Sequence, residues 1–265
     1  MKFKKSLGQN LLIDKNIIKK ILSLTTIKNK EIIEIGAGTG NLSTEILKQN
    51  PKKFICIEKD KKFVNSLKIL FKNEKNISVV NGDILKLDLG RIISDKTILF
   101  GNLPYNISTQ ILIKFIRFVP WPPKFDKMIF MFQKEVGEKI IANFGSRNFS
   151  RLSIIVKSRL KILNYFFVSK NCFFPKPKVD SMLIEFKPID RKDLNLKSIK
   201  TLEYITNIFF SKKRKMINKT FKELKIDDDN FFKSLNIDLT LRPEKLKEDK
   251  YYKIAEYYEK KLLNK

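Results

Sequence analysis

The chain of 265 residues contains no histidine. Histidine is the side chain most often used as a general base and as a metal ligand near neutral pH. Its absence excludes a catalytic triad built on histidine and argues against a zinc site. We therefore expect a chemistry that needs neither a metal nor a histidine base.

Cysteine and long apolar runs are also scarce. The two thiols, Cys56 and Cys172, do not form a C-x-x-C pair, and so few thiols in a chain of this length indicate a reducing compartment. No apolar run reaches the ~20 residues that a membrane-spanning helix needs. The basic N-terminus is not followed by the apolar segment of a signal peptide. We expect a soluble, cytoplasmic protein with no membrane partner.

Acidic residues are outnumbered by basic ones. The chain has 28 Asp and Glu against 55 Lys and Arg, which gives a formal net charge of +27. A positive field of this size attracts nucleic acid or acidic lipid surfaces. Only eight of the basic residues are arginine, so a coding bias toward lysine accounts for part of the excess, but it does not cancel the charge. An anionic partner is favoured.

Short β-branched runs alternate with amphipathic segments along the first part of the chain. They predict strands at 32–35, 54–58, 77–80, 98–100 and 128–132, and helices at 42–47, 63–71, 109–118 and 135–141. A further helix, capped by Asp14, precedes the first strand. Such alternation predicts a mainly parallel sheet covered by helices. Two later apolar runs, 160–168 and 182–186, predict a closing antiparallel pair.

The composition changes after Pro188. Lysine-rich segments at 202–210, 216–224 and 251–263 have a helical pattern with little strand character. We therefore predict two domains, an α/β domain over 1–187 and a small helical domain over 188–265.

A glycine-rich turn follows the first predicted strand. Residues 36–40 read Gly-Ala-Gly-Thr-Gly and open a helix, which puts small residues where a ligand approaches the backbone closely. The dinucleotide fingerprint needs glycine at the position of Asn41, so NAD is disfavoured. Glu58 ends the next strand, 22 positions after Gly36, where a carboxylate can accept hydrogen bonds from ribose hydroxyls. Alternatively, the glycine turn is only a tight loop and Glu58 an ordinary surface acid. The two features together favour a site for an adenosine-containing ligand.

Two further segments end at the same edge of the predicted sheet. Asp83 follows the third strand, where its carboxylate could meet an adenine amine. The sequence from Asn102 to Tyr105, Asn-Leu-Pro-Tyr, follows another strand and is therefore expected beside the glycine turn. N-x-P-Y after a strand is the signature of amino-group methyltransferases that act on adenine or cytosine.

The fuller string Asn-Leu-Pro-Tyr-Asn-Ile-Ser-Thr at 102–109 resembles the bacterial small-subunit ribosomal RNA adenine dimethyltransferases, the kasugamycin-sensitivity methylase family. Segments at 8–12, 133–136, 177–181 and 210–218 agree with the same family. The resemblance implies a Rossmann-like class I S-adenosylmethionine-dependent methyltransferase, an α/β fold, with a small C-terminal helical domain. It further implies S-adenosylmethionine as methyl donor and two adjacent adenosines as target, in a hairpin loop near the 3′ end of small-subunit (16S) ribosomal RNA. The implied partner is that RNA or the assembling small subunit, and the implied protein is a monomer that also assists subunit biogenesis.

Site residues follow from the resemblance at matching positions. The implied cofactor contacts are Asn10, Leu12, Gly36, Glu58, Asp83 and Asn102. The implied catalytic residues are Asn102, Leu103, Pro104, Tyr105 and Phe173, with Tyr105 and Phe173 stacking on the target adenine. Phosphate contacts are expected from one helical stretch that contains Lys212, Lys213, Arg214 and Lys215.

The chain departs from the family pattern at three positions. Leu11 stands where phenylalanine is usual, Ala37 where proline is common, and Lys176 interrupts a run of three prolines. The lysine puts a charge beside the target base, which would change how the RNA sits. Either Phe173 or Phe174 could be the stacking ring, and the alignment to Lys-Val-Asp-Ser at 178–181 favours Phe173.

Two other functions are compatible with parts of this pattern. A related enzyme could modify large-subunit RNA or DNA, but the string at 102–109 and the basic segment at 212–215 argue against this. A ribosome-assembly factor without catalytic activity could keep the fold, but Gly36, Glu58, Asn102 and Tyr105 are intact.

Overall fold

The structure is a computed structural model and describes residues 10–263. These residues form two compact units, one over 10–137 and 161–188 and the other over 138–160 and 189–263. Gly8 and Gln9, the first residues of the 8–12 segment, lie outside the described residues. Among residues 10–263, none of the helices combines the length and the apolar character that crossing a bilayer would need.

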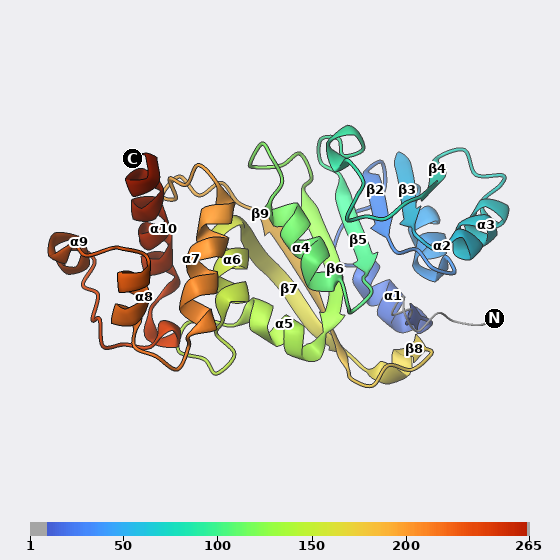
Figure 1. Ribbon diagram of the computed structural model, residues 1–265. Helices are drawn as coiled ribbons and strands as arrows, with labels where there is room; N and C mark the ends of the chain where they lie inside the picture. Colours follow the sequence, from blue (N-terminus) through green and yellow to red (C-terminus); the bar gives the residue numbers. More distant parts are fainter. Residues whose placement is uncertain (1–9, 264–265) are drawn as a thin grey trace. The chain divides into compact units, whose positions relative to one another are not determined.

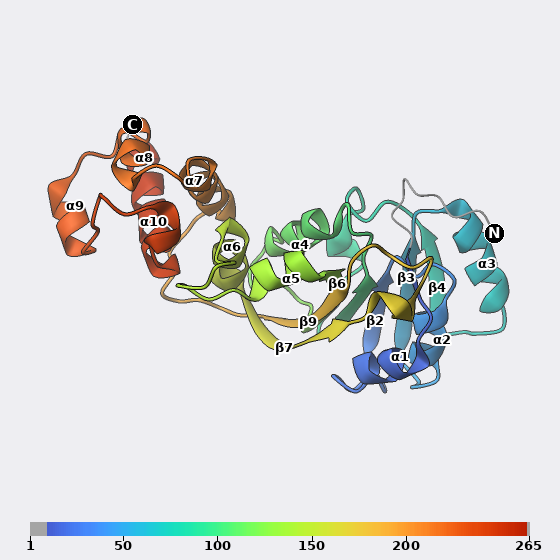
Figure 2. The ribbon, with the colours of Figure 1, turned by 90° about the horizontal axis from the view of Figure 1, so that it is seen from below.

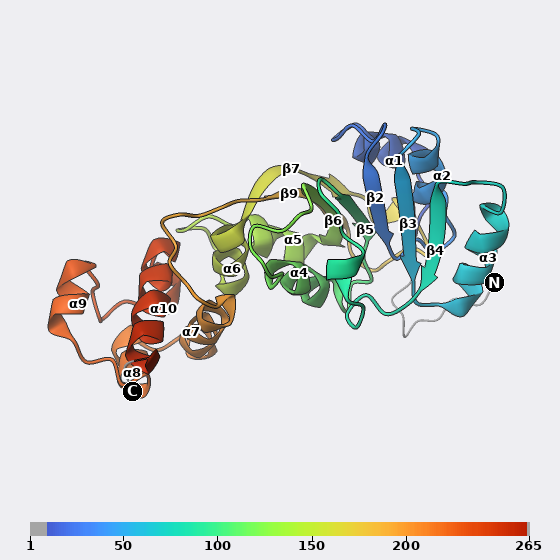
Figure 3. The same cartoon turned by 90° about the horizontal axis from the view of Figure 1, so that it is seen from above.

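The first unit is built on a seven-stranded sheet with the order β4-β3-β2-β5-β6-β9-β7. Five strands are parallel, namely β2 (Glu31–Ile35), β3 (Lys53–Glu58), β4 (Ile77–Asn81), β5 (Ile98–Asn102) and β6 (Lys127–Gln133). Strand β9 (Ser181–Pro188) pairs antiparallel with β6, and β7 (Leu160–Val168) forms the edge. Figure 3 shows β2, β3 and β4 side by side. The predicted parallel sheet is confirmed.

The order of the strands reverses between β2 and β5. The chain runs outward from β2 through β3 to β4, then returns to the other side of β2 for β5 and β6 (Figure 1). An open α/β sheet binds its ligands outside the carboxyl ends of its strands, at such a point of reversal.

Helices cover both faces of the sheet (Figure 2). The apolar residues of α1 (Lys15–Leu22), α2 (Asn41–Leu47) and α3 (Lys61–Leu70) share one core cluster with inward residues of β2, β3 and β5. On the opposite face, α4 (Ser108–Ile116) packs its Phe115 ring against Phe130 of β6, with centroids 5.6 Å apart. Helix α5 (Lys134–Ile141) follows β6 directly.

A second, two-stranded sheet joins distant parts of the first unit. Strand β1 (Leu11–Leu12) pairs antiparallel with β8 (Phe173–Phe174), so that Leu12 lies opposite Phe173. The Asn41 side chain donates to the Leu12 carbonyl oxygen at 2.8 Å and ties β1 to α2. The sequence did not predict these two-residue strands, because neither is long enough to give a periodic pattern.

The second unit is helical. It contains α6 (Arg151–Arg159), α7 (Ile199–Ser211), α8 (Ile217–Glu223), α9 (Asp229–Ser234) and α10 (Glu248–Leu263). Phe209 packs edge-on against Phe221 and Tyr251 in its core. Residues 138–160 belong to this unit, whereas the sequence assigned them to the α/β domain. The reason is α6, whose Ile154 carbonyl oxygen accepts a hydrogen bond from Tyr252 of α10 at 3.2 Å.

A carboxyl group is buried in the core of the first unit. Glu34 on β2 is 2% exposed, and its Oε2 atom accepts a hydrogen bond from the Ser43 hydroxyl of α2 at 2.5 Å. Burial raises the pKa of Glu34 to about 8, and the Ser43 hydrogen bond opposes the rise. The side chain therefore keeps its proton in the folded chain under conditions in which the unfolded chain has released it.

We predict that this carboxyl makes the folded chain less stable as pH rises from about 4.5 to about 8. Over that interval the folded chain binds the proton and the unfolded chain does not, so the free energy of unfolding falls by up to ~1.4 kcal/mol per pH unit. Glu34→Gln keeps an acceptor for Ser43 and cannot ionise. Denaturant unfolding at several pH values should show a flatter pH dependence for this variant, whereas Glu74→Gln, at an exposed position, should follow the parent. Parallel profiles for Glu34→Gln and the parent would contradict the prediction.

Candidate functional site

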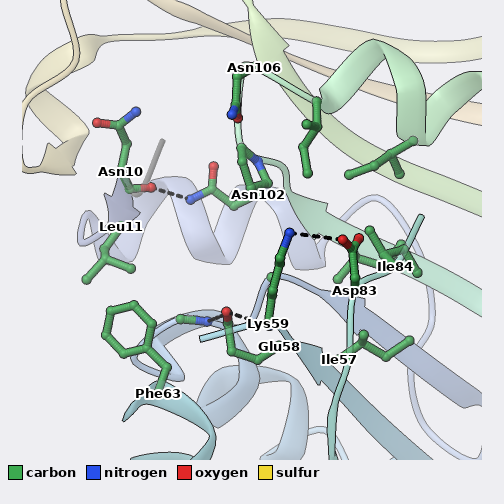
Figure 4. Close-up of a pocket in the computed structure, with 17 residues that line it drawn as sticks. Asn10, Leu11, Ile57, Glu58, Lys59, Phe63, Asp83, Ile84, Asn102 and Asn106 are labelled. Carbon is green, nitrogen blue, oxygen red and sulfur yellow. Dashed lines mark hydrogen bonds and ion pairs between the residues drawn. The ribbon is translucent and has the colours of Figure 1, made fainter. Parts of the chain in front are cut away.

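A pocket lies at the carboxyl ends of the central strands (Figure 4). Six of the residues predicted for the site line it, namely Asn10, Gly36, Glu58, Asp83, Asn102 and Pro104. They come from segments spread over almost a hundred residues of sequence, and the reversal between β2 and β5 brings them together. The pocket also has apolar walls that the sequence did not predict, formed by Leu11, Ile35, Ile57, Phe63, Ile84, Ile107 and Ile111.

The glycine turn after β2 lies against the loop after β5. Gly36 has φ +75°, and a Cβ atom there would lie 3.7 Å from the Asn102 carbonyl oxygen. Gly38 has φ +56°, and a Cβ atom there would lie 2.6 Å from a methyl carbon of Leu11. Both positions have a left-handed backbone, which disfavours a side chain, and at Gly38 a side chain would also displace Leu11. The turn can therefore approach a ligand with its backbone alone.

Glu58 fixes the shape of the turn. Its Oε2 atom accepts a hydrogen bond from the Gly38 N–H at 3.0 Å, and its Oε1 atom accepts from the N–H groups of Lys59 and Asp60, each at 2.8 Å. The side chain is only 8% exposed. Burial raises the pKa of Glu58, and the three backbone donors oppose that rise. Two carboxylate oxygens have about four acceptor positions, so capacity for a ligand hydroxyl remains.

An ion pair stands at the end of β4. Lys59 Nζ lies 2.9 Å from Asp83 Oδ2, and the Leu85 N–H donates to Asp83 Oδ1 at 3.0 Å. The lysine lowers the pKa of Asp83. Lys59 also lines the pocket but was not predicted as a site residue, although its position next to Glu58 in sequence gave a signal.

The side-chain amide of Asn102 is oriented by the N-terminal segment. Asn102 Nδ2 donates to the Asn10 carbonyl oxygen at 2.7 Å. An asparagine amide has one donor group and one acceptor oxygen, so engaging the donor leaves Oδ1 as the atom that can accept a hydrogen bond from a ligand. The backbone carbonyl group of Asn10 therefore orients the Asn102 side chain.

Four predicted residues do not line the pocket. Leu12 and Leu103 are 4% and 1% exposed, and Leu11 rather than Leu12 faces the cavity. The Tyr105 hydroxyl lies 2.5 Å from the Ser181 hydroxyl. Phe173 is 2% exposed within the core cluster, whereas its neighbour Phe174 is 58% exposed. A base could reach the Phe173 ring only if the ring were uncovered.

The basic segment 212–215 is exposed but is not part of a helix. Helix α7 ends at Ser211, Lys212 is its C-terminal cap, and the four residues form the turn that leads to α8. The predicted helical stretch is therefore wrong for these residues. Lys212 pairs with Glu223 of α8.

Comparisons with known proteins agree with this geometry. A family profile described as ribosomal RNA adenine dimethylase matches residues 1–260. The chain is 45% identical over 259 residues to a ribosomal RNA small subunit methyltransferase A from Pelagibacter ubique, covering 98% of each chain. It is 36% identical to the protein of the same name from Mesomycoplasma hyopneumoniae, covering 96% of each.

Solved structures give the same result. A dimethyladenosine transferase from Plasmodium falciparum superposes with a TM-score of 0.79 and 28% identity, covering 95% of this chain and 98% of that one. The 23S rRNA methyltransferase ErmE superposes with a TM-score of 0.69 at 19% identity, covering 94% and 100%; this likeness shows the fold alone. The fold is that of class I S-adenosylmethionine-dependent methyltransferases, as predicted. The chain belongs to the ribosomal RNA adenine dimethylase family.

Proposed function

We propose that the protein transfers methyl groups from S-adenosylmethionine to the N6 amine of two adjacent adenosines near the 3′ end of small-subunit (16S) ribosomal RNA. The names of its relatives support this substrate. The observation that carries the proposal is the meeting of the glycine turn, Glu58 and the oriented Asn102 amide in one pocket. Labelled methyl transfer to small ribosomal subunits from a methylase-deficient strain tests it.

The pocket fits the cofactor. The Glu58 carboxylate lines the pocket and keeps about one acceptor position beyond its three backbone donors, which would accept a hydrogen bond from a ribose hydroxyl. The Asp83 carboxylate stands at the next strand end, where it can accept from the adenine amine, and the apolar walls can cover the ring faces. Asn10, Gly36 and Asn102 line the pocket on the side of the β5 loop. We propose that Leu12 contributes through the backbone of its segment, since its side chain is buried.

Asn102 and Leu103 would act on the target amine. The lone pair of an adenine amine is delocalised into the ring, which makes the amine a poor nucleophile. Two acceptors, Asn102 Oδ1 and the Leu103 carbonyl oxygen, would localise that lone pair and stabilise the positive charge that develops on nitrogen. The cofactor supplies a methyl group that its sulfonium centre has already activated. The methylated nitrogen then loses its proton to water, so the reaction needs no histidine.

Pro104 and the aromatic residues would hold the base. Flipping a base out of its stack costs a few kcal/mol, and stacking on an aromatic ring returns about 1 to 3 kcal/mol. We propose that Tyr105 provides one face. Phe174, whose side chain is exposed, would provide the other, whereas Phe173 could do so only if β8 separated from β1.

We further propose that the helical unit contacts the RNA and that the protein acts as a cytoplasmic monomer that assists subunit biogenesis. The exposed turn at 212–215 adds four positive charges on one short segment. Phosphate contacts of this kind release counterions from the RNA, which makes affinity dependent on salt.

Glu58→Ala should weaken S-adenosylmethionine binding about tenfold or more, because a ribose hydroxyl would lose its acceptor at a cost of about 1 to 3 kcal/mol. The substitution also releases the Gly38 N–H, so melting without ligand should be measured alongside calorimetry. Glu74→Ala, which removes an exposed carboxyl, should bind like the parent. If Glu58→Ala binds S-adenosylmethionine with the affinity of the parent, Glu58 does not contact the cofactor.

Asn102→Ala should lower single-turnover methyl transfer by about two to three orders of magnitude, by analogy with removing one electrostatic stabiliser. RNA binding and melting should change little if the role is catalytic. Asn73→Ala, at an exposed position, is the control. A folded Asn102→Ala variant that methylates near the parent rate would refute the mechanism, and a poorly folded one would indicate that Asn102 shapes the loop instead.

Replacing Lys212, Lys213, Arg214 and Lys215 by alanine should flatten the plot of log RNA affinity against log salt, by about one unit of slope for each phosphate contact removed. Because Lys212 is already paired with Glu223, we expect a change of about three. The control removes the same charge from exposed positions in the other unit, Lys52, Lys68, Lys72 and Lys75. Equal slopes for the two variants would mean that the RNA lies elsewhere.

A further inference from the structure

Two aromatic rings that the proposed mechanism does not use are exposed on the edge strand of the first unit. Tyr165 and Phe167 on β7 are 53% and 54% exposed. They are two positions apart, so both side chains point to the same face of the sheet. At about 3.3 Å per residue their Cα atoms are roughly 6.6 Å apart, so each ring can take a separate planar group. Two exposed aromatic side chains on a charged surface suggest a partner whose own planar rings stack on them.

Lysine side chains lie near these rings. Lys134 Nζ lies 5.1 Å from the centroid of the Phe167 ring, and Lys161 is exposed on the same face of β7. From residue 160 to residue 180 the chain has four lysines and one acidic residue, Asp180. The centre of a protein interface is poor in lysine, whereas surfaces that bind single-stranded nucleic acid combine basic side chains with aromatic stacking rings. The chemistry favours RNA over a protein partner.

The rings are connected to the loop that contains Asn102. The Lys134 N–H donates to the Asp180 carbonyl oxygen at 2.9 Å. The next residue, Ser181, lies opposite Gln133 at the carboxyl end of β6, and its hydroxyl meets the Tyr105 hydroxyl at 2.5 Å. Lys134 thus lies over the exposed Phe167 ring with its side chain and bonds through its backbone to Asp180, the residue before Ser181. Phe167 therefore lies near the carboxyl end of β6, which is the end of the sheet that holds the proposed reaction site.

We propose that Tyr165 and Phe167 form a stacking platform for unpaired bases that flank the target adenosines, with Lys134 and Lys161 contacting the adjacent phosphates. The proposal rests on the proposed function for the identity of the RNA. It adds a second RNA contact, in the catalytic unit, that recognises single-stranded nucleotides by their ring faces rather than by sequence. Such a contact would hold the substrate beside the pocket while one base is flipped into it.

The test uses the full-length chain with Tyr165→Leu/Phe167→Leu, which keeps apolar bulk and removes both ring systems. Two probes are used, a short fluorescent oligouridylate, which has no adenine for the pocket, and unmodified small ribosomal subunits. Tyr204→Leu is the matched control, because Tyr204 is 48% exposed in the helical unit. Tyr165→Trp/Phe167→Trp is the rescue variant, since indole also stacks on bases.

We expect the leucine variant to bind both probes about tenfold more weakly or worse, with S-adenosylmethionine affinity and melting unchanged. The tryptophan and Tyr204→Leu variants should bind like the parent. Oligouridylate affinity that is equal for the leucine variant and the parent overturns the platform. So does light scattering that finds a dimeric parent and a monomeric leucine variant, because a second copy of the chain would then cover the rings. A parent that binds oligouridylate through these rings but transfers no methyl group to subunits overturns the proposed function and leaves the platform standing.

Discussion

The carboxylate of Glu58 accepts three backbone hydrogen bonds, one from the glycine turn after β2 and two from the loop after β3. The Gly36 N–H also donates to the Ile57 carbonyl oxygen at 2.8 Å, so the ladder between β2 and β3 continues into the glycine turn. The buried Glu58 side chain extends this connection to Gly38, beyond the ends of the strands. Because these backbone groups are already hydrogen-bonded before a ligand arrives, binding has little backbone to order, and ordering costs are a main reason for weak binding. The cost of this arrangement is a buried carboxylate, whose pKa is raised as a result.

Much of this architecture could be predicted from the sequence. The predicted strands 54–58, 77–80 and 128–132 match β3, β4 and β6 to within one residue at each end, because these parallel strands are short apolar runs with clear ends. Gly36, Glu58, Asp83, Asn102 and Pro104 meet in one pocket, because carboxyl ends of parallel strands lie at the same end of the sheet. The fold and the gathering of the site follow from local patterns and one topological rule.

Other features depend on contacts that no local pattern encodes. Helix α6 was missed, and with it the domain assignment of 138–160, because its partners on α7 and α10 follow much later in the chain. The orientation of the Asn102 amide depends on a carbonyl group 92 residues away. Phe173 and Phe174 are adjacent and chemically identical, and only the pairing of β8 with β1 decides that one is buried and the other exposed.

The pairing of β1 with β8 also affects the order in which the protein can be made. Leu12 is synthesised roughly 160 residues before its partner Phe173. Contacts of such large sequence separation form late, because a long loop must close first. Asn10 precedes β1 directly, so the strand pairing that positions its carbonyl group can form only after Phe173 and Phe174 have been added to the chain. A nascent chain could thus fold its glycine turn and Glu58 early, while the element that orients the Asn102 amide waits for residues far downstream, which would delay competence for catalysis until synthesis is well advanced.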